Sequence, residues 1–492
     1  MPSKSHPIIV FIAIVLLSTS LACSLSTLLP QAEPTPLPPS PSPLPPTPTA
    51  TQPQPRTVRI APDGSGDYPD LPSAVADLVA GSTILLDPGT YTLVETLQID
   101  KTLSIQGSGM ENTTLSSASA DGVLKFTGPG NLVLQGISFL YFGTEWAYVA
   151  EIGNGSFDIQ GCRFSGGVRD LEEEIGGNGL FVNGSGNGSV INCAFEDNQH
   201  HGLSVVDQVN ILVDSCTFQN NQNVGLGFWL TATGIVRNCQ SINNDTGYAT
   251  SDQSSVTFED NIAQNNDFGF YAYDSSILVA NRNESFENDF SGFGVGQQAS
   301  ATFEDNKAYQ NTEGGFISFE DAIQIARNNE AYNNGLQGFV TQGQSYGVFE
   351  NNIAYGNEAG LSFREDSTGE ASGNEFYNNR LSGIMLSGNA SGIMTVNISR
   401  DNSEAGIRVA ENSTCTINGN SIEENGLSGI IVRDNASATI QDNIISANLG
   451  WAIGFYDFAT GSVSNNQCSG NSDGGIGLFN SADPELINTT CQ

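Results

Sequence analysis

Residues 265–274 read NNDFGFYAYD, residues 377–387 read YNNRLSGIMLS, and residues 424–434 read ENGLSGIIVRD. All three are versions of one repeat, in which an asparagine precedes a glycine and apolar residues then occupy alternate positions. The repeat glycines are 22 or 23 residues apart, with Ala452 in the one vacant position: Gly179, Gly202, Gly225, Gly247, Gly269, Gly292, Gly315, Gly338, Gly360, Gly383, Gly406, Gly429 and Gly475. A fixed period of this length indicates a solenoid, in which each repeat buries its apolar face against its neighbours.

The spacing within each repeat favours β-strands over helices. Ile430 and Val432 alternate with Ile431, as expected for a strand with one face buried, and no helical stripe is present. Glycine and asparagine are also too frequent for helices. One repeat is therefore expected to form one coil of a parallel β-helix, with equivalent residues about 4.8 Å apart in successive coils.

Two polar columns share this period. The first is Asn198, Asn221, Asn244, Asn266, Asn288, Asn311, Asn334, Asn357, Asn379, Asn402, Asn425, Asn448 and Asn471. The second begins as Cys193, Cys216 and Cys239 and continues as Asn261, Asn283, Asn306, Asn329, Asn352, Asn374, Asn397, Asn420, Asn443 and Asn466. Inward asparagines can donate and accept along such a stack, so we interpret these columns as structural rather than catalytic.

The columns resemble those of right-handed parallel β-helix repeat proteins, the superfamily of pectate lyases, pectinesterases and NosD-like periplasmic proteins, over about residues 57–492. The segment from Val58 (VRIAPDGSGDYPDLPSAVADLVAGSTILLDPGTYTLVETLQIDKTLSIQGSG) resembles the opening of pectinesterases. That resemblance implies a first strand and a short capping helix, expected near Ser73–Ala80 with Asp70 or Ser73 as its cap. The predicted fold is all-β: a single-stranded right-handed parallel β-helix with regular coils over about residues 179–492, its handedness carried by the resemblance and by the preference for right-handed crossovers.

The N-terminal residues predict export. Residues 1–22 have the pattern of a secretory signal peptide, and SLAC at 20–23 resembles a lipobox that would make Cys23 the lipidated residue. Ordinary signal cleavage is the alternative. Residues 23–56 contain a proline-rich stretch that favours extended polyproline II and would serve as a stalk. The expected location is outside the cytoplasmic membrane, at the cell surface or in the periplasm, with a lipid anchor in the membrane.

Composition limits the partners. The net charge is −37, from 16 Lys+Arg against 53 Asp+Glu. Such a field repels phosphate backbones, so no nucleic-acid partner is expected. It also repels polyuronates unless calcium bridges the like charges.

No catalytic signature of the β-helix enzymes is recognisable. The weak candidates are His200 and His201, Arg364 beside Glu365, and Arg433 beside Asp434. A histidine pair in a turn is more often a surface feature than a general base, and an arginine beside a carboxylate is more often a solvated pair.

The outward columns suggest a binding face. Trp229, Tyr271, Tyr273 and Phe319 are expected to share one exposed face, bordered by the carboxylates Asp252, Asp274, Glu320 and Asp321, which are also weak candidates for calcium. Flat rings beside carboxylates suit sugar rings, which offer apolar C–H faces and hydroxyl edges. The rings are expected two coils, or about 10 Å, apart. Ordinary exposed apolar residues are the alternative interpretation.

Two other features stand out. Cys468 and Cys491 are 23 residues apart, so they are stacked and a disulfide between them is possible. The cysteine column is a poor zinc site because a stack cannot converge tetrahedrally. The aromatic-rich residues 139–152 and the acidic insertion at 167–177 precede the regular coils, and the insertion either lines a binding face or is a solvated loop.

Three functional hypotheses follow. The first is an exported, surface-tethered protein that binds a polysaccharide or cell-envelope glycan, or that has a structural role in the envelope. The second is a polysaccharide lyase, C5-epimerase or glycoside hydrolase with an unrecognised site. The third is a NosD-like role in maturing a metalloenzyme. Its weakness is that this chain has no His or Met cluster to hold copper, with only four Met. The fold alone does not choose among them.

Overall fold

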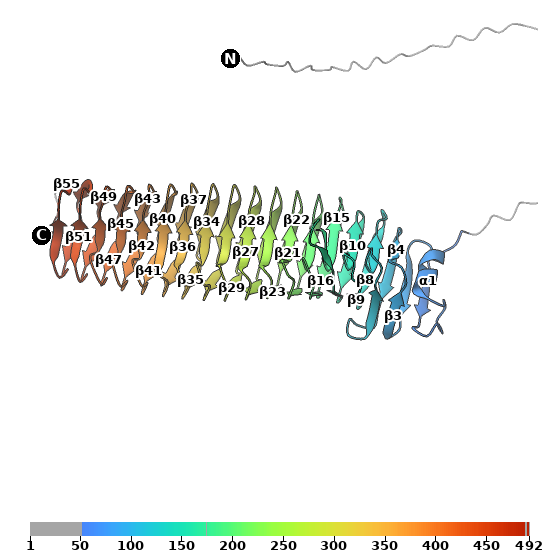
Figure 1. Ribbon diagram of the computed structural model, residues 1–492. Coiled ribbons are helices and arrows are strands. Elements are labelled where there is room, and N and C mark those ends of the chain that lie inside the picture. The colour runs from blue at the N-terminus through green and yellow to red at the C-terminus, as the bar shows by residue number, and fades with distance from the viewer. Residues whose placement is uncertain (1–51, 174, 488–489, 492) are drawn as a thin grey trace, which may run out of the picture. The chain divides into compact units, whose positions relative to one another are not determined.

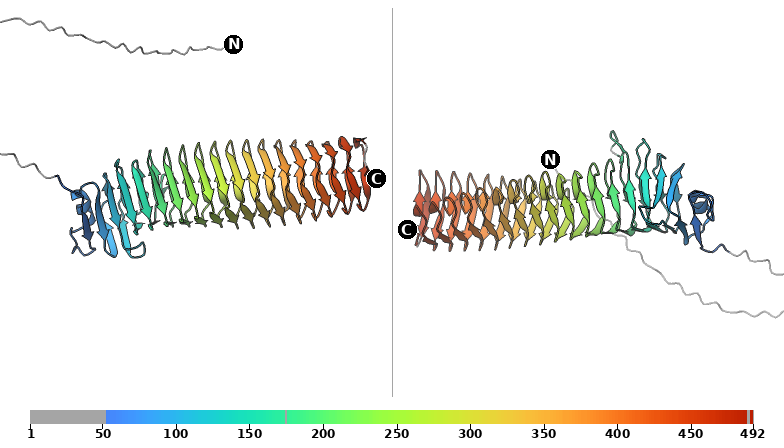
Figure 2. Two further views of the ribbon diagram at one scale, coloured as in Figure 1. Left: turned by 180° about the vertical axis from the view of Figure 1, so that it is seen from behind. Right: turned by 90° about the horizontal axis from the view of Figure 1, so that it is seen from below.

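A computed structural model describes residues 52–173, 175–487 and 490–491. The predicted signal peptide, Cys23 and the stalk as far as residue 51 lie outside the described residues. From Pro53 onward the chain forms one compact unit. In it the chain winds through successive coils, and each full coil contributes one strand to each of three parallel sheets, here called sheets A, B and C (Figures 1 and 2).

Sheet A runs the whole length of the solenoid. Its 19 strands are β1 (Thr57–Ile60), β2 (Ser82–Leu86), β5 (Leu103–Gln106), β8 (Asn131–Gln135), β11 (Ser156–Gln160), β16 (Asn187–Ile191), β19 (Asn210–Asp214), β22 (Thr233–Arg237), β25 (Ser255–Glu259), β28 (Ile277–Asn281), β31 (Ser300–Glu304), β34 (Ile323–Arg327), β37 (Tyr346–Glu350), β40 (Thr368–Ser372), β43 (Ser391–Thr395), β46 (Thr414–Asn418), β49 (Ser437–Gln441), β52 (Thr460–Ser464) and β55 (Asp483–Ile487).

Sheet B follows sheet A in each coil and has short strands. They are β3 (Gly89–Leu93), β6 (Thr113–Ser117), β9 (Ser138–Tyr141), β12 (Arg163–Ser165), β17 (Ala194–Glu196), β20 (Thr217–Gln219), β23 (Gln240–Ile242), β26 (Ile262–Gln264), β29 (Glu284–Phe286), β32 (Lys307–Tyr309), β35 (Glu330–Tyr332), β38 (Ile353–Tyr355), β41 (Glu375–Tyr377), β44 (Ile398–Arg400), β47 (Ser421–Glu423), β50 (Ile444–Ser446) and β53 (Gln467–Ser469).

Sheet C completes each coil, and the repeat glycines lie in its strands or directly before them. Its strands are β4 (Leu97–Ile99), β7 (Leu124–Phe126), β10 (Ala150–Gly153), β15 (Leu180–Asn183), β18 (Leu203–Val205), β21 (Val224–Phe228), β24 (Thr246–Thr250), β27 (Phe268–Ala272), β30 (Ser291–Val295), β33 (Phe316–Ser318), β36 (Gln337–Thr341), β39 (Ala359–Phe363), β42 (Ile384–Leu386), β45 (Ile407–Val409), β48 (Ile430–Val432), β51 (Trp451–Phe455) and β54 (Gly474–Leu478).

The strand register matches the sequence columns, and the predicted parallel β-helix is confirmed. Phe293 pairs with Phe270 on one side and with Phe316 on the other. The side chains at this position form one inward stack, fully buried except for the half-buried last member: Phe270, Phe293, Phe316, Phe339, Leu361, Ile384, Ile407, Ile430, Ile453 and Ile476. The rings of Phe293 and Phe316 stack at 4.7 Å between centroids. This stack is the core of the regular coils.

From Asn261 onward, asparagine ladders hold two of the three corners of the coils. The backbone N–H of Asn261 donates to Oδ1 of Asn283 at 2.9 Å, and its Nδ2 donates to the same oxygen at 3.0 Å. Nδ2 of Asn261 also donates to the carbonyl of Val236 at 2.9 Å. The residue before each ladder asparagine turns the chain with a left-handed conformation, as Asp260 does at φ 55°. Both asparagine columns are therefore structural, as predicted.

The cysteines at the start of the second column continue the same ladder with thiols. The N–H of Cys216 donates to Sγ of Cys239 at 3.3 Å, and the N–H of Cys239 donates to Oδ1 of Asn261 at 2.9 Å. Cys162, Cys193, Cys216 and Cys239 are buried and free, whereas Cys468 and Cys491 form a disulfide with their Cα atoms 4.7 Å apart. Burial raises the pKa of the Cys162 and Cys216 thiols well above the ordinary value.

Helix α1 (Leu71–Asp77) covers part of the N-terminal end of the solenoid. The carboxylate of Asp70 accepts the N–H of Ser73 at 2.8 Å, so Asp70 is the cap. The predicted range Ser73–Ala80 is wrong by two to three residues at each end, because Asp70 caps the helix and the backbone is already extended at Leu78. Leu71, Ala74 and Val75 are its buried residues.

Candidate functional site

The outer face of sheet C carries the four predicted aromatic residues. On β27 Phe270 is buried, while the next residue, Tyr271, points outward. Tyr273 lies just after β27, and Trp229 and Phe319 take the equivalent positions after β21 and β33. All four side chains are half-buried. A row of aromatic rings therefore lies along one face of the solenoid.

Three of these rings form one cluster. The ring centroid of Tyr271 lies 4.7 Å from Phe268, 5.3 Å from Tyr273 and 5.9 Å from Phe319. In the intervening coil the outward positions are Gly294 on β30 and Gly296 just after it, where an added Cβ would meet the rings of Tyr271 and Phe319. The absence of side chains at these two positions lets the rings lean together over β30. The predicted spacing of about 10 Å is therefore wrong for Tyr271 and Phe319, whose backbones are two coils apart but whose rings are in contact.

Trp229 stands apart from this cluster and packs against histidine. Its ring lies 4.8 Å from that of His201, which in turn lies 3.6 Å from the ring of His200. The N–H of Val224 donates to Nδ1 of His201 at 3.3 Å. Burial, followed by the charges of His200 and Arg169, lowers the pKa of His201 well below 6.5. His201 is therefore a neutral, buried packing residue, and His200 is the half-exposed member of the pair.

A hairpin closes one end of the aromatic row. The insertion at 167–177 forms β13 (Arg169–Asp170) and β14 (Ile175–Gly176), which pair antiparallel. An isolated bridge joins Ala147 to Val168, so the aromatic loop before it is tied to the hairpin. The hairpin also meets the histidine pair, because Gly177 accepts the N–H of His200 at 3.0 Å. The insertion therefore borders the outer face of sheet C, with an exposed tip, and its part in a binding face stays a prediction.

The sequence did not single out the rings beside this hairpin. Tyr148 stacks on Phe181 at 4.5 Å, and Trp146, with 41% of its surface exposed, lies 6.4 Å from Tyr148. Phe181 occupies the outward column of sheet C, so the 22–23-residue register could have identified it. Trp146 and Tyr148 lie in irregular coils, where that register does not reach.

The predicted carboxylates line the corner between sheets C and A, and two of them have structural roles. Asp252 accepts the backbone N–H of Leu230 at 2.9 Å, and Asp274 accepts that of Asp252 at 3.3 Å. The same contact recurs along the column, for example between Glu411 and the N–H of Gly388 at 2.8 Å. These carboxylates bind the preceding coil and are thus only partly available to a ligand.

Asp274, Glu320 and Asp321 line one shallow depression of about 370 Å³. Asp252, which was predicted with them, is not part of it. Among the described residues, no group of three or more His, Cys, Asp or Glu side chains is arranged to hold a metal ion. Calcium stays an untested prediction.

A second row of carboxylates follows the corner between sheets B and C. Asp245 and Asp267 occupy equivalent places in neighbouring coils, with the N–H of Asp267 donating to the carbonyl of Asp245 at 2.8 Å. Desolvation and the neighbouring Asp267 raise the pKa of Asp245, while Arg169 opposes the shift. Desolvation and Asp289 raise the pKa of Asp267. This pair was not predicted from the sequence, although its 22-residue spacing is visible there.

The predicted arginines lie beyond the aromatic cluster. Arg433 pairs with its neighbour Asp434 at 3.3 Å, the solvated pair anticipated from the sequence. Arg364 takes the position equivalent to Phe319, two coils further on. Its backbone N–H donates to Oγ of Ser367 at 3.0 Å. The structure does not bring either arginine to the histidine pair.

Sheet B carries an aromatic ladder that the sequence analysis also missed. Its outward rings stack at 4.8–5.1 Å with interplanar angles of 4–10°: Phe286, Tyr309, Tyr332, Tyr355 and Tyr377. Arg400 covers the last ring at 4.5 Å. Because each ring face is covered by its neighbour, this ladder presents edges rather than faces to solvent. It is therefore less suited to sugar stacking than the row on sheet C.

The family model described as the right handed beta helix region matches residues 148–308, 269–368 and 353–491. These matches together span residues 148–491, well over half of the chain, so the protein belongs to the right-handed β-helix family. No curated protein matches the sequence. No helix within the described ranges is long and apolar enough to cross a membrane.

Several solved structures are similar. The mannuronan C-5 epimerase AlgE4 A-module of Azotobacter vinelandii shares 14% identity at a TM-score of 0.29, covering 83% of this chain and 91% of that one. The periplasmic alginate epimerase AlgG shares 12% at 0.33, covering 85% and 83%. Pre-mature gene product 12 of bacteriophage phi29 shares 11% at 0.44, covering 81% and 69%. Similarity at this level concerns the fold and does not identify a ligand.

Proposed function

We propose that the protein binds a polysaccharide chain along the outer face of sheet C. The observation that carries the proposal is the row of half-buried rings on this face, seated above glycines and flanked on both sides by carboxylates. Sugar rings present apolar C–H faces that stack on aromatic rings and hydroxyl groups that hydrogen-bond to carboxylates. An extended chain fits because the face continues from coil to coil.

The rings differ in how much of their surface is free to stack on a sugar. Tyr271 has Phe268, Tyr273 and Phe319 around it, and burial raises its pKa to about 12. Among the described residues, the one ring contact of Tyr273 is with Tyr271, and that of Trp229 is with His201. Trp229 and Tyr273 therefore have more free ring surface for a sugar, and Tyr271 positions its neighbours.

The flanking charge favours an uncharged glycan. The rows containing Asp245 and Asp274 border the rings on opposite sides, so a uronic-acid polymer would be repelled unless a cation intervened. Since Asp274 already accepts a backbone N–H, we expect binding to a neutral glycan without added calcium. A uronate that binds only with calcium would instead implicate Glu320 and Asp321.

The test is retention on immobilised polysaccharides, neutral and uronic, with and without calcium. Trp229→Ala combined with Tyr273→Ala should abolish retention on the glycan that the parent binds, because each stacking ring contributes on the order of 1–2 kcal/mol. The melting temperature should change little. The matched control is Tyr332→Ala with Tyr346→Ala, which removes rings from sheets B and A and should leave retention intact.

Equal retention of the parent and the Trp229/Tyr273 variant on every glycan would show that this face is not the site. Loss of retention in the control variant as well would point to a general effect on folding. If the sheet C face is not the site, the hairpin at 167–177 is the next region to alter.

A catalytic role is the second candidate, favoured by one observation. Asp245, whose pKa is raised, lies at the corner beside the ring-bearing face, just before β24, and is within electrostatic reach of Arg169. A carboxylic acid with a raised pKa can donate a proton to a leaving group, as a hydrolase, lyase or epimerase requires. In this proposal Asp245 would handle the proton, and Arg169 with His200 would orient the sugar.

Activity would be measured as released reducing ends, released unsaturated ends and change in uronate configuration. Asp245→Asn should remove turnover while leaving retention on the same glycan unchanged. Asp289→Asn, two coils further along the same corner, is the matched control. Absence of turnover in the parent on every glycan that it binds would leave binding as the function.

We further propose that the protein is exported and anchored through lipidated Cys23, with the solenoid held away from the membrane by the proline-rich stretch. Cys23→Ser should then release the protein from the membrane fraction without changing its melting temperature. Unchanged fractionation would remove the lipid anchor. A NosD-like maturation role stays a prediction without a supporting feature among the described residues.

A further inference from the structure

The N-terminal end of the solenoid is covered unequally. Strand β1 pairs with β2, so sheet A has one more strand there than its neighbours. Between β1 and β2 the chain forms a loop and helix α1 instead of strands for sheets B and C. Among the described residues, β3 therefore pairs only with β6, and β4 only with β7. Both are edge strands facing this end.

The hydrogen bonds show which groups face the edge. The N–H of Gly89 donates to Asn112 and that of Leu97 donates to Val123, both toward the next coil. In a parallel pair, alternate residues bond to opposite sides. The peptide groups of Thr90, Thr92 and Gln98 therefore point toward the open end, where no main-chain partner is present within the described ranges.

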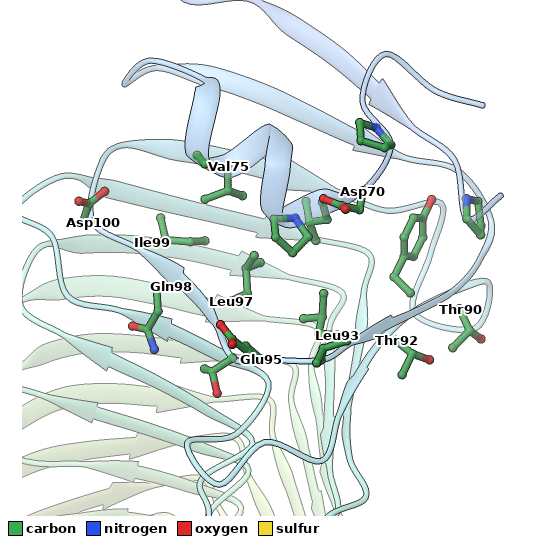
Figure 3. A pocket seen from close by; sticks show the side chains of 18 of the residues that line it. Asp70, Val75, Thr90, Thr92, Leu93, Glu95, Leu97, Gln98, Ile99 and Asp100 are labelled. Atoms are coloured by element: carbon green, nitrogen blue, oxygen red, sulfur yellow. The ribbon is translucent and has the colours of Figure 1, made fainter. Parts of the chain in front are cut away.

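A groove runs beside these edges. It encloses about 810 Å³ between α1, the loop before it and the segment from Thr90 to Lys101. Figure 3 shows Val75 of α1 approaching Ile99 of β4, with Leu97 and Leu93 further along the floor. The groove is distant from the aromatic row on sheet C. Its apolar floor and unpaired strand edges are the two features that a further β-strand needs.

The rim of the groove is acidic, so it favours a basic added strand over an acidic one. Asp70, Glu95 and Asp100 line the groove, against one cation, Lys101. Glu95 and Asp100 are exposed and take part in no ion pair found among the described residues. A strand with lysine or arginine on its outward positions would meet this excess of carboxylates, whereas an acidic strand would be repelled.

We propose that this groove binds an extended, basic peptide segment of another protein, which adds to the free edge of β3. Backbone hydrogen bonds to Thr90 and Thr92 fix the strand, alternate apolar side chains enter the groove, and the basic side chains face Glu95 and Asp100. This site is independent of the glycan face, so either proposal can fail without the other.

The experiment measures the binding of synthetic peptides to the full chain. The peptides have about ten residues, which is the length of a long strand. A peptide of alternating lysine and valine should bind at least about tenfold more tightly than its glutamate–valine counterpart. N-methylation of every second residue of the lysine peptide should weaken binding by about tenfold or more, because it removes the edge hydrogen bonds and keeps the charge. This arm separates strand addition from general attraction to an acidic protein.

The second part of the experiment uses a substitution that fills the groove. Ala76 is an exposed residue of α1 that lines the groove, so Ala76→Trp should weaken peptide binding by about tenfold or more without loss of folding. Ser73→Trp, exposed on the same helix outside the groove lining, is the matched control and should bind like the parent. Glu95→Gln with Asp100→Asn should reduce the preference for the basic peptide while retaining N-methyl sensitivity.

Equal binding of the N-methylated and unmodified peptides would overturn the proposal, as would equal binding by Ala76→Trp and the parent. Concentration-dependent sedimentation that Ala76→Trp abolishes, without any peptide binding, would also overturn it and assign the edge to a second copy of the chain. Glycan retention should be the same in all these variants.

Discussion

Nδ1 of the buried His201 accepts the backbone N–H of Val224, at 3.3 Å, so this imidazole is fixed as the neutral form that carries its proton on Nε2. The hydrogen bond joins the turn before β18 to the start of β21, and Trp229 packs on the same histidine ring. A protonated His201 would lose this acceptor and bury a charge beside His200 and Arg169.

The first prediction follows from that pKa. The folded value lies below 6.5, so the unfolded chain takes up a proton that the folded chain does not, and the free energy of unfolding falls as the pH drops below about 6.5. The melting temperature should fall between about pH 7.5 and pH 5.5, and His201→Gln should reduce this fall. His200→Gln is the control and should retain it. An identical fall in the parent and His201→Gln would contradict the prediction.

The asparagine ladder should be costly to interrupt. Asn329 accepts the N–H of Asn306 at 2.9 Å and donates to the carbonyl of Phe303 at 2.9 Å and to Oδ1 of Asn352 at 3.0 Å. Asn329→Ala removes the partner of the buried N–H of Asn306 and this donor to the carbonyl of Phe303, at about 1–3 kcal/mol each, while Oδ1 of Asn352 keeps the backbone N–H of residue 329. Urea denaturation should therefore show a loss of several kcal/mol.

The cysteines supply the matched test of the ladder. Cys239→Asn should be neutral or stabilising, because asparagine adds a strong donor at a position where Asn261 already forms the next step. A destabilisation as large as that of Asn329→Ala would show that the thiol and amide steps are not equivalent.

The inward stack should respond as a packed core. Phe316 lies between Phe293 at 4.7 Å and Phe339 at 4.9 Å and is fully buried. Phe316→Ala should lower the free energy of unfolding by about 3–5 kcal/mol through the cavity it leaves, and Phe316→Leu by less. A loss below about 1 kcal/mol for alanine would be inconsistent with the register described here.

The disulfide should protect one end of the solenoid. Cys468 and Cys491 close a 23-residue loop, which in the chain-entropy model is worth about 3 kcal/mol. Because repeats interact mainly with their neighbours, Cys468→Ser with Cys491→Ser should increase hydrogen exchange in β53–β55 and leave β24–β33 unchanged. Faster exchange spread evenly over all coils would contradict local protection.

The coils could be predicted because each occupies 22 or 23 residues and repeats the same inward positions, as Phe316 and Asn329 do. What could not be predicted was how side chains lean across coils. Gly296 looks like one more glycine in the sequence, yet its bare backbone is what lets Phe319 reach Tyr271. Likewise, the corner carboxylate of Asp252 looked free, and only the structure shows its bond to the N–H of Leu230.

The asparagine ladders also give the solenoid an electrical direction. From Asn261 to Asn443, each Nδ2 donates toward the next coil and each Oδ1 accepts from the previous one. The side-chain amides are thus aligned head to tail, as peptide dipoles are in a helix, and each polarises the next. Their oxygens point toward the N-terminal end and their N–H groups toward the C-terminal end, so the two ends of this all-β stack carry opposite partial charges.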